Sequence, residues 1–243
     1  MRLDSYPAPP AVLNGMALLL DFDGTLVDIA ATPGQVIVPD GLVADLTRLS
    51  GALGGAIAIV SGRPIAELDA LLAPMRLAAA GEHGAAIRSA PDAATMRPAL
   101  PVLPPVWREV AAECAHARPG VVVEQKAAGL VLHYRLAPGA GPMLRQRLMQ
   151  LLGEDSDFEI MEAAAAWEVR PRGIDKGRAV RRLMRHAPFR GRVPLYIGDD
   201  VTDEDGMAAA RALGGLGLRV QESFGNAAGV RAWLGRMAHG MPA

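Results

Sequence analysis

The stretch MALLLDFDGTL, residues 16–26, joins a short apolar run to two carboxylates and a glycine. The apolar run predicts a strand that is buried on both faces. Because side chains two residues apart in a strand point the same way, Asp21 and Asp23 are expected to share one side, and Gly24 lets the backbone turn away sharply. Carboxylates at this spacing suit a hard Mg²⁺ ion, which prefers oxygen ligands. A solvated turn and a sugar-nucleotide-binding Asp-x-Asp are the alternatives, but the complete hexapeptide behind an apolar strand favours the metal site.

Other apolar runs along the chain also end in polar residues or glycine. They are Ala56–Val60 before Ser61, Leu77–Ala80 before Gly81-Glu82-His83-Gly84, and Leu195–Ile197 before Gly198-Asp199-Asp200. Between them lie stretches of helical spacing at Leu42–Leu49, Ile65–Leu72 and Lys176–His186. Continuous apolar strands that alternate with helices predict an α/β fold whose parallel sheet is covered on both faces. Ligands of such sheets bind beyond the carboxyl ends of the strands, where these acidic and hydroxyl residues gather.

Ser61-Gly62-Arg63-Pro64 follows a predicted strand and opens a predicted helix. Pro64 suits the first helical position, because the N–H that it lacks would have no partner there. A hydroxyl group and free backbone N–H groups at a helix N-terminus form an anion site, and phosphate is the natural occupant. A plain helix cap is the alternative for this segment taken alone.

Lys176 stands at the start of a predicted helix, where a positive charge opposes the helix macrodipole. Helix stability therefore does not explain the lysine. Neutralising a bound phosphate would explain it, although a solvated lysine is the commoner case for such a position in isolation.

The stretch GDDVTDED holds five acids directly after the last of these strands. Crowded carboxylates repel one another, and a bound cation relieves that repulsion. Asp199, immediately beyond the strand, is the expected metal ligand, with Asp200 and Asp203 in support. Thr202 with Asp205 three residues later resembles a capping box at the start of a helix.

The middle of the chain has a different organisation. Prolines between residues 91 and 105 mark an irregular link. After it come a predicted helix at Val106–Ala117, strands at Val121–Glu124 and Leu130–Leu136, a helix at Gly141–Leu152 and a strand at Trp167–Arg170. The short link between the first two strands predicts an antiparallel hairpin. We therefore expect a small α+β unit, 101–170, inserted between two parts of an α/β core, 1–100 and 171–243.

Length and composition restrict the class of protein. The chain has 243 residues and a formal net charge of −1, which gives no electrostatic reason to expect nucleic acid or an anionic membrane as a partner. Cys114 is the single cysteine, so an intrachain disulfide is excluded and a small buried residue is expected. Residues 1–15 carry an acid and three prolines where a signal peptide needs an apolar run, so a cytoplasmic protein is expected.

Taken together, these segments resemble the haloacid dehalogenase (HAD) superfamily of phosphatases, motif by motif and in order. Asp21-x-Asp23-Gly24-Thr25 is similar to motif I, Ser61 to motif II, Lys176 to motif III and Gly198-Asp199-Asp200 to motif IV. The expected insert lies where the superfamily carries its C2-type cap domains. The longer stretches VSGR, GEHG, EQK, HYR, WEVRPRGIDKG and IGDDVTDED are similar to the trehalose-6-phosphate phosphatase family.

The resemblance implies a Mg²⁺-dependent phosphatase that hydrolyses trehalose 6-phosphate to trehalose and phosphate. It implies that Asp21 attacks phosphorus to form an aspartyl-phosphate, and that Asp23 protonates the leaving oxygen and then activates water. Ser61 and Lys176 would complete the catalytic set by holding the phosphate oxygens.

The same resemblance implies a wider set of contacts. It assigns the metal to Asp21, to Asp23 through its backbone carbonyl, to Asp199 and to Asp200. It assigns the substrate to Ser61, Gly62, Arg63, Glu82, His83, Glu124, Lys126, Glu168, Arg170 and Lys176. The expected partner is this small molecule, without nucleic acid or membrane, and the expected state is a monomer.

Three other functions stay open on the sequence. A receiver domain of two-component signalling has a similar acidic pocket, but its length would leave half of this chain unexplained. A sensing module that binds a sugar phosphate without cleaving it tends to lose one of the two carboxylates Asp21 and Asp23. Another phosphatase of the same fold, acting on sucrose phosphate, a glycosyl phosphoglycerate or a hexose phosphate, is the serious rival, because the core motifs are common to all of them.

Overall fold

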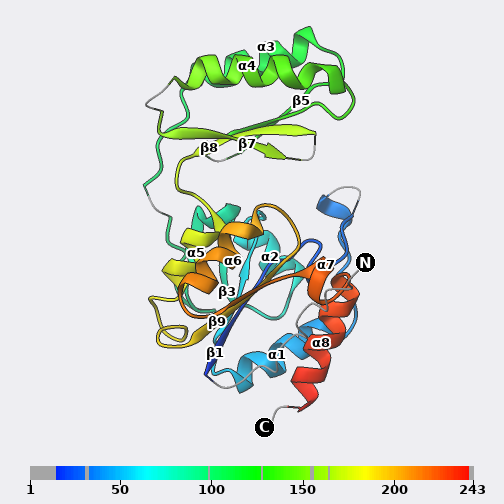
Figure 1. Ribbon diagram of the computed structural model, residues 1–243, viewed down its shortest axis with the longest axis vertical. Helices are drawn as coiled ribbons and strands as arrows, with labels where there is room; N and C mark the ends of the chain where they lie inside the picture. Colours follow the sequence, from blue (N-terminus) through cyan, green and yellow to red (C-terminus); the bar gives the residue numbers. More distant parts are fainter. Residues whose placement is uncertain are drawn as a thin grey trace, which may run out of the picture. The chain divides into compact units, whose positions relative to one another are not determined.

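Strand β1 (Met16–Leu20), formed by the apolar run before Asp21, lies inside a six-stranded sheet (Figure 1). A computed structural model describes residues 15–30, 33–97, 99–126, 128–153, 156–163 and 165–240. These residues divide into two compact units. One comprises the described residues before 99 and from Asp175 onward, and the other comprises Ala99–Ile174.

The sheet of the first unit has the strand order β10-β9-β1-β2-β3-β4. Its strands are β2 (Ile57–Val60), β3 (Ala78–Gly81), β4 (Ala86–Arg88), β9 (Val193–Gly198) and β10 (Leu216–Arg219). All neighbours pair in parallel except β4, which is antiparallel to β3 at the edge. The strand order thus runs outward from β1 in both directions, which places a topological switch point at its carboxyl end.

Helices cover both faces of this sheet. They are α1 (Leu42–Ala52), α2 (Ile65–Leu71), α5 (Lys176–Leu183), α6 (Asp203–Ala212), α7 (Val220–Ser223) and α8 (Ala227–Gly240). Helix α1 packs on α8, and α5 packs on α6, and Figure 1 shows these pairs on opposite sides of the strands. Strand residues such as Leu18, Leu19 and Ile197 are completely buried between the two layers. The α/β fold class predicted from continuous apolar strands is confirmed.

The second unit is an antiparallel sheet with two helices on one face (Figure 1). Its strand order is β5-β6-β8-β7, with bounds β5 (Val122–Gln125), β6 (Leu130–His133), β7 (Phe158–Ala163) and β8 (Ala166–Pro171). Helices α3 (Pro105–Ala117) and α4 (Gly141–Leu152) pack against it. The predicted hairpin is present as the β5–β6 pair.

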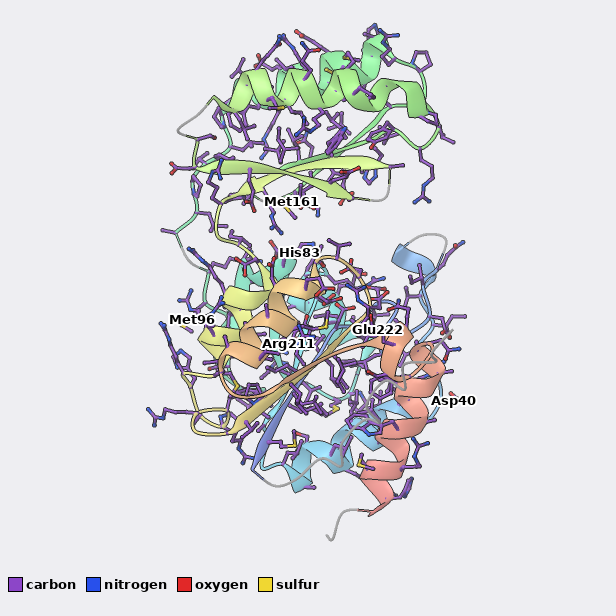
Figure 2. All side chains as sticks on the ribbon, in the orientation of Figure 1. Asp40, His83, Met96, Met161, Arg211 and Glu222 are labelled. Atoms are coloured by element: carbon purple, nitrogen blue, oxygen red, sulfur yellow. The ribbon has the colours of Figure 1, made fainter. Side chains whose placement is uncertain are left out.

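Alternation along β8 separates two kinds of side chain. Trp167 and Val169 belong to the apolar cluster under the helices, together with Phe158 and Leu144. Side chains of successive strand residues point to opposite faces, so Glu168 and Arg170 lie on the face without helices. Met161, which pairs with Glu168 across β7 and β8, lies on that same face in Figure 2.

Element ends and short strands differ from the sequence prediction. Strand β6 ends at His133 rather than Leu136, because the N–H of Ala137 donates to the Tyr134 carbonyl and begins a turn before the short helix η3 (Pro138–Ala140). Helix α5 ends at Leu183 rather than His186. The strands β4, β7 and β10 were not predicted. Two other single turns, η1 (Pro33–Gln35) and η2 (Glu82–Gly84), lie in loops of the first unit. Within the described residues, no helix is long and apolar enough to cross a membrane.

Candidate active site

The predicted site residues of the first unit follow three neighbouring strands. Asp21 comes directly after β1, Ser61 after β2 and Asp199 after β9. Since β1 lies between β9 and β2 and pairs in parallel with both, these three positions meet at one edge of the sheet. Lys176 joins them from the first position of α5.

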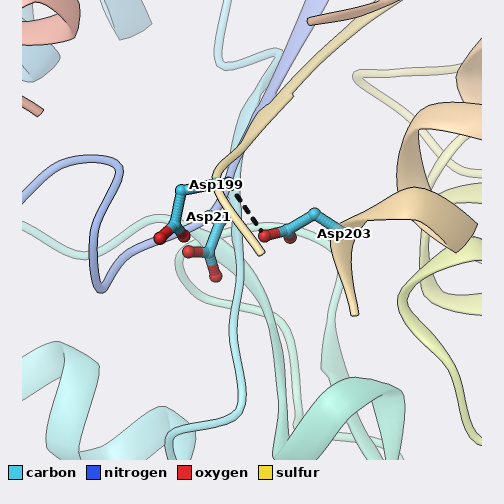
Figure 3. Close-up of side chains that lie close together, drawn as sticks. All are labelled: Asp21, Asp199 and Asp203. Carbon is cyan, nitrogen blue, oxygen red and sulfur yellow. Dashed lines mark hydrogen bonds between the residues drawn. The ribbon is translucent and has the colours of Figure 1, made fainter. Parts of the chain in front are cut away.

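Three carboxylates converge at this edge (Figure 3). Asp21, Asp199 and Asp203 each offer one oxygen, and these atoms lie within 4.8 Å of one another. The Lys176 ammonium donates to Asp21 Oδ1 and to Asp203 Oδ1, both at 2.7 Å. Three carboxylates against one ammonium leave an excess of negative charge in a largely buried place.

Burial and the neighbouring charges shift the pKa values of these groups. Burial raises the pKa of Asp21 well above its usual value, against the opposing charge of Lys176. Burial, together with Asp200 and Asp203, raises the pKa of Asp199 to about 6. Burial alone would lower the pKa of Lys176, but the charges of Asp21 and Asp203 outweigh it and raise that pKa. The ammonium is therefore firmly charged, while the carboxylates still need further positive charge.

These residues fit a divalent cation. The donors are all carboxylate oxygens, the ligand type that Mg²⁺ takes in proteins. Gly24, at φ +76°, lets the loop after β1 pass so close to Asp199 that any Cβ there would clash with the Asp199 carboxylate. The two strand ends thus hold Asp21 and Asp199 together with no side chain between them.

Asp203 differs from Asp21 and Asp199 in its role, which is structural. Its Oδ1 accepts from Lys176 at 2.7 Å and from the Tyr196 hydroxyl at 2.6 Å. Its Oδ2 accepts from the backbone N–H groups of Asp200 and Asp199 at 3.1 Å, and Figure 3 shows the bond from Asp199. Both oxygens are therefore engaged by donors of the protein. Asp203 orients the turn after β9 and anchors Lys176.

The predicted capping box at Thr202 is wrong. The Thr202 side chain makes no cap hydrogen bond to α6, and its hydroxyl donates instead to Asp200 Oδ1 at 2.7 Å. That same oxygen accepts from the N–H groups of Thr202 and Asp203, so Asp200 caps the start of the helix. The Asp200 side chain lies outside the three-carboxylate group.

The Asp23 carboxylate pairs with Arg63, whereas the resemblance assigned Asp23 to the metal through its backbone carbonyl. The Arg63 guanidinium donates from Nε to Asp23 Oδ2 at 2.6 Å and from Nη2 to Oδ1 at 2.7 Å. It also pairs with Glu67, one helical turn further on. The backbone N–H of Arg63 donates to Ser61 Oγ, which is buried at the end of β2.

The GEHG segment is bound to this loop through its backbone. The N–H of Glu82 donates to the Arg63 carbonyl, and that of His83 donates to the Ser61 carbonyl, both at 3.0 Å. Both residues have positive φ, and the His83 ring lies so close to Gly62 that a Cβ there would clash with it. The Glu82 carboxylate pairs with Arg97 through both oxygens.

The predicted substrate residues of the second unit lie in three ion pairs. Lys126 donates to Glu168 at 2.8 Å, His133 pairs with Glu124 at 2.9 Å, and Arg170 donates to Glu159 at 2.8 Å. Strand pairing of β5, β6, β8 and β7 brings these residues onto one face. His133 belongs to the HYR stretch quoted for the family resemblance but was not assigned to the substrate, and Glu159 was not singled out from the sequence.

Comparison with known proteins gives a consistent result. The sequence profile of the trehalose-phosphatase family matches residues 19–228. The trehalose-6-phosphate phosphatase of Escherichia coli (strain K12) is 37% identical over 217 residues, which cover 87% of this chain and 79% of that protein. A probable trehalose-phosphate phosphatase of Sinorhizobium fredii is 40% identical over 213 residues, covering 86% and 78%.

A solved structure has the same fold. It is the C-terminal domain of the C. albicans trehalose-6-phosphate phosphatase, which superposes with a TM-score of 0.74 at 24% identity and covers 98% of this chain and 100% of that domain. On the profile match and the two sequence relatives, this chain belongs to the trehalose-phosphatase family.

Proposed function

We propose that this protein hydrolyses trehalose 6-phosphate to trehalose and inorganic phosphate, with Mg²⁺ and through an aspartyl-phosphate. The observation that carries the proposal is Asp21, a buried carboxylate at the switch point of the sheet, paired with Lys176 and beside Asp199. An anionic nucleophile that must meet an anionic phosphate needs this positive charge close by. Membership of the trehalose-phosphatase family supports the choice of substrate.

In the first step, an Asp21 oxygen attacks phosphorus while the bond from phosphorus to the sugar oxygen breaks. Asp23 gives its proton to that departing oxygen, so trehalose leaves as a neutral alcohol. In the second step, Asp23 takes a proton from water, and the water oxygen displaces Asp21 from phosphorus. The side chain of Asp23 is 36% exposed, which leaves it accessible to a leaving group and to water.

Asp21, Asp199 and the Asp23 backbone carbonyl would hold the metal, and bound Mg²⁺ would offset the negative charge of the phosphoryl group. Lys176 and Ser61 would hold the phosphate oxygens. The Lys176 ammonium already lies 2.7 Å from Asp21, and the Ser61 hydroxyl, which accepts a hydrogen bond from Arg63, keeps its own proton to donate. Both come from rigid element ends, which suits a site that must bind one charged group in one orientation.

We further propose that the second unit is a cap that selects the sugar, through Glu124, Lys126, Glu168 and Arg170. Its face without helices is rich in paired charges. Sugar hydroxyls both donate and accept, so such a face offers partners for each of them. The core chemistry acts on a phosphoryl group and would accept many phosphate esters, so selection requires contacts elsewhere.

A second candidate is a phosphatase for another sugar phosphate, since the core residues are common to the whole fold class. A sensing module is disfavoured because both Asp21 and Asp23 are retained. We expect a monomer that acts in the cytoplasm on this small molecule alone.

The test is a phosphate-release assay with the purified full chain, Mg²⁺ and a panel of sugar phosphates. We expect trehalose 6-phosphate to give the highest kcat/KM, chelation to abolish turnover and Mg²⁺ to restore it. Asp21→Asn keeps the shape and an acceptor for Lys176 but removes the attacking anion, so kcat should fall at least about 10³-fold. A folded Asp21→Asn protein with more than about a tenth of the wild-type activity would exclude Asp21 as nucleophile.

A further inference from the structure

The orientation of the Asp23 carboxylate is fixed by a two-point contact. Arg63 donates to both Asp23 oxygens, at 2.6 and 2.7 Å, and its side chain is only 8% exposed. A bidentate guanidinium fixes the plane of a carboxylate as well as its distance. Asp23 lies in the loop after β1, and Arg63 lies between β2 and α2, so the contact joins two adjacent strand ends.

Arg63 is in turn held by groups other than Asp23. Glu67, in the first turn of α2, pairs with Nη1 of the same guanidinium. The Phe22 ring lies under the guanidinium, with its centroid 5.8 Å from Arg63 Cζ. The hydrogen bond to Asp23, together with the charges of Asp23 and Glu67, raises the pKa of Arg63, so the guanidinium stays charged.

From this geometry we propose that Arg63 and Glu67 are positioning residues for proton donation by Asp23. Arg63 holds one Asp23 oxygen so that the other oxygen, once it has taken up a proton, faces the departing oxygen, and Glu67 keeps Arg63 in place from the adjacent helical turn. The inference rests on the proposed function, because Asp23 is the group that protonates the leaving oxygen there. Neither residue needs to touch the substrate for this role.

If Asp23 is positioned in this way, the effect of displacing it should depend on the basicity of the leaving group. Phenolate is a stronger base than 4-nitrophenolate, so it depends more on receiving a proton as it leaves phosphorus. The 4-nitrophenolate anion is stable and needs the proton far less. Displacing the Asp23 carboxyl group should therefore slow phosphoryl transfer from phenyl phosphate more than phosphoryl transfer from 4-nitrophenyl phosphate. Both esters lack a sugar, so contacts with a sugar do not enter the comparison.

The experiment measures kcat/KM for both esters with Mg²⁺, in the wild type, Glu67→Gln and Arg63→Lys. The parameter kcat/KM covers the steps up to aspartyl-phosphate formation, where the leaving group departs. For Arg63→Lys, which keeps the charge but loses the two-point contact, we expect the loss on phenyl phosphate to exceed that on 4-nitrophenyl phosphate by about tenfold or more. Glu67→Gln should change the ratio in the same direction, by about threefold or more.

Asp92→Asn is the control, because it removes a carboxylate of the same unit at an exposed loop position after β4, outside the Asp23–Arg63–Glu67 contacts. It should change both esters in equal proportion. Equal losses on the two esters in Glu67→Gln and Arg63→Lys would overturn the positioning role while leaving the phosphatase assignment intact. A wild-type protein that releases phosphate from neither ester nor from trehalose 6-phosphate would overturn the proposed function, and the positioning role with it.

Discussion

Asp203 is completely buried, and four donors surround its carboxylate. A carboxylate is stable in such a place only if its oxygens are satisfied, and here each oxygen has two partners. Two of those donors are the N–H groups of Asp199 and Asp200, so Asp203 determines the course of the chain just after β9. Gly198 leaves space for it, since a Cβ there would clash with the Asp203 side chain. Asp203 thus helps to position Asp199, another acid of the same cluster.

Gly24→Ala tests whether the close approach of the β1 loop to Asp199 matters for the metal. The new Cβ would displace the Asp199 carboxylate, so the Mg²⁺ concentration for half-maximal activity should rise about tenfold or more. Direct titration of Mg²⁺ by calorimetry should show the same loss of affinity.

Gly41→Ala is the control for backbone strain. Gly41 has φ +85°, close to the +76° of Gly24, but a Cβ there would meet nothing within 4 Å. A left-handed alanine costs about 1–2 kcal/mol of stability in either place. If Gly24→Ala weakened Mg²⁺ binding no more than Gly41→Ala does, Asp199 would not depend on this loop.

Three of the site residues predicted from sequence share one property, which is that each follows an apolar strand. Asp21, Ser61 and Asp199 are placed by local strand pattern alone, and parallel strands then bring them to one edge. Glu67 and Tyr196 could not be identified in this way. A glutamate on a short helix is ordinary, and a tyrosine inside an apolar strand indicates burial without indicating what its hydroxyl contacts.

At the scale of elements, a buried ion pair holds α2 to the edge of the sheet. Arg88 on β4 is almost fully buried and donates to Asp69 of α2 at 2.5 and 2.6 Å. It also donates to the Leu77 carbonyl just before β3. Helix α2 begins after Arg63, so this contact stabilises the element that carries one side of the site.

Asp69→Asn should destabilise the protein in a pH-dependent way. The hydrogen bond from Arg88 lowers the pKa of Asp69 in the folded protein, against the effect of burial. A lowered carboxyl pKa contributes stability above the unfolded-state pKa of about 4, and this contribution is lost as the pH falls through the folded value. At pH 7 the variant leaves a buried guanidinium without its carboxylate, so unfolding free energy should fall by about 3 kcal/mol.

Urea unfolding at pH 7 and at about pH 3.5 measures this, and the difference between wild type and variant should shrink at the lower pH. Asp92→Asn, at an exposed loop position after β4, is the control and should be neutral at both. A difference that stayed constant with pH would mean that shape rather than charge at Asp69 supports the fold.

The longer helices were predictable, whereas three strands with a short or irregular pattern were not. The helices at α1, α3 and α4 have several turns, so their apolar spacing repeats and can be recognised. Strands β4 and β10 are three and four residues long, and strand β7 alternates only partly. Their pairing partners lie elsewhere in the chain, so the local pattern contains too little information to identify them.

At the scale of the whole molecule, the chemistry and the charged sheet face belong to different units. The acids and Lys176 lie in the unit that contains β1, and the ion pairs of Glu168, Glu124 and Arg170 lie in the unit Ala99–Ile174. From the sequence we expect an inserted unit at 101–170, because continuous apolar strands give way there to a hairpin between proline-containing links. Which sugar the second unit recognises could not follow from pattern, because charged residues on a strand are also typical of a solvated face.

Glu168→Gln tests the proposal that this face selects the sugar. The substitution keeps the size of the side chain but weakens both its pairing with Lys126 and its capacity to accept from sugar hydroxyls. We expect kcat/KM for trehalose 6-phosphate to fall about tenfold or more, because a site built for hydroxyl groups loses much when one partner is removed. Part of the loss should appear in kcat, since binding energy from the distant sugar helps to orient the reacting phosphate. Hydrolysis of 4-nitrophenyl phosphate should stay within about twofold of the wild type, because that ester has no sugar to lose contacts with.

Glu162→Gln is the matched control, since Glu162 is exposed on β7 and pairs with Trp167, which places it on the opposite face of the same sheet. If Glu168→Gln lowered both activities equally, or if Glu162→Gln matched it on trehalose 6-phosphate, the face would serve the stability of the second unit rather than the choice of substrate.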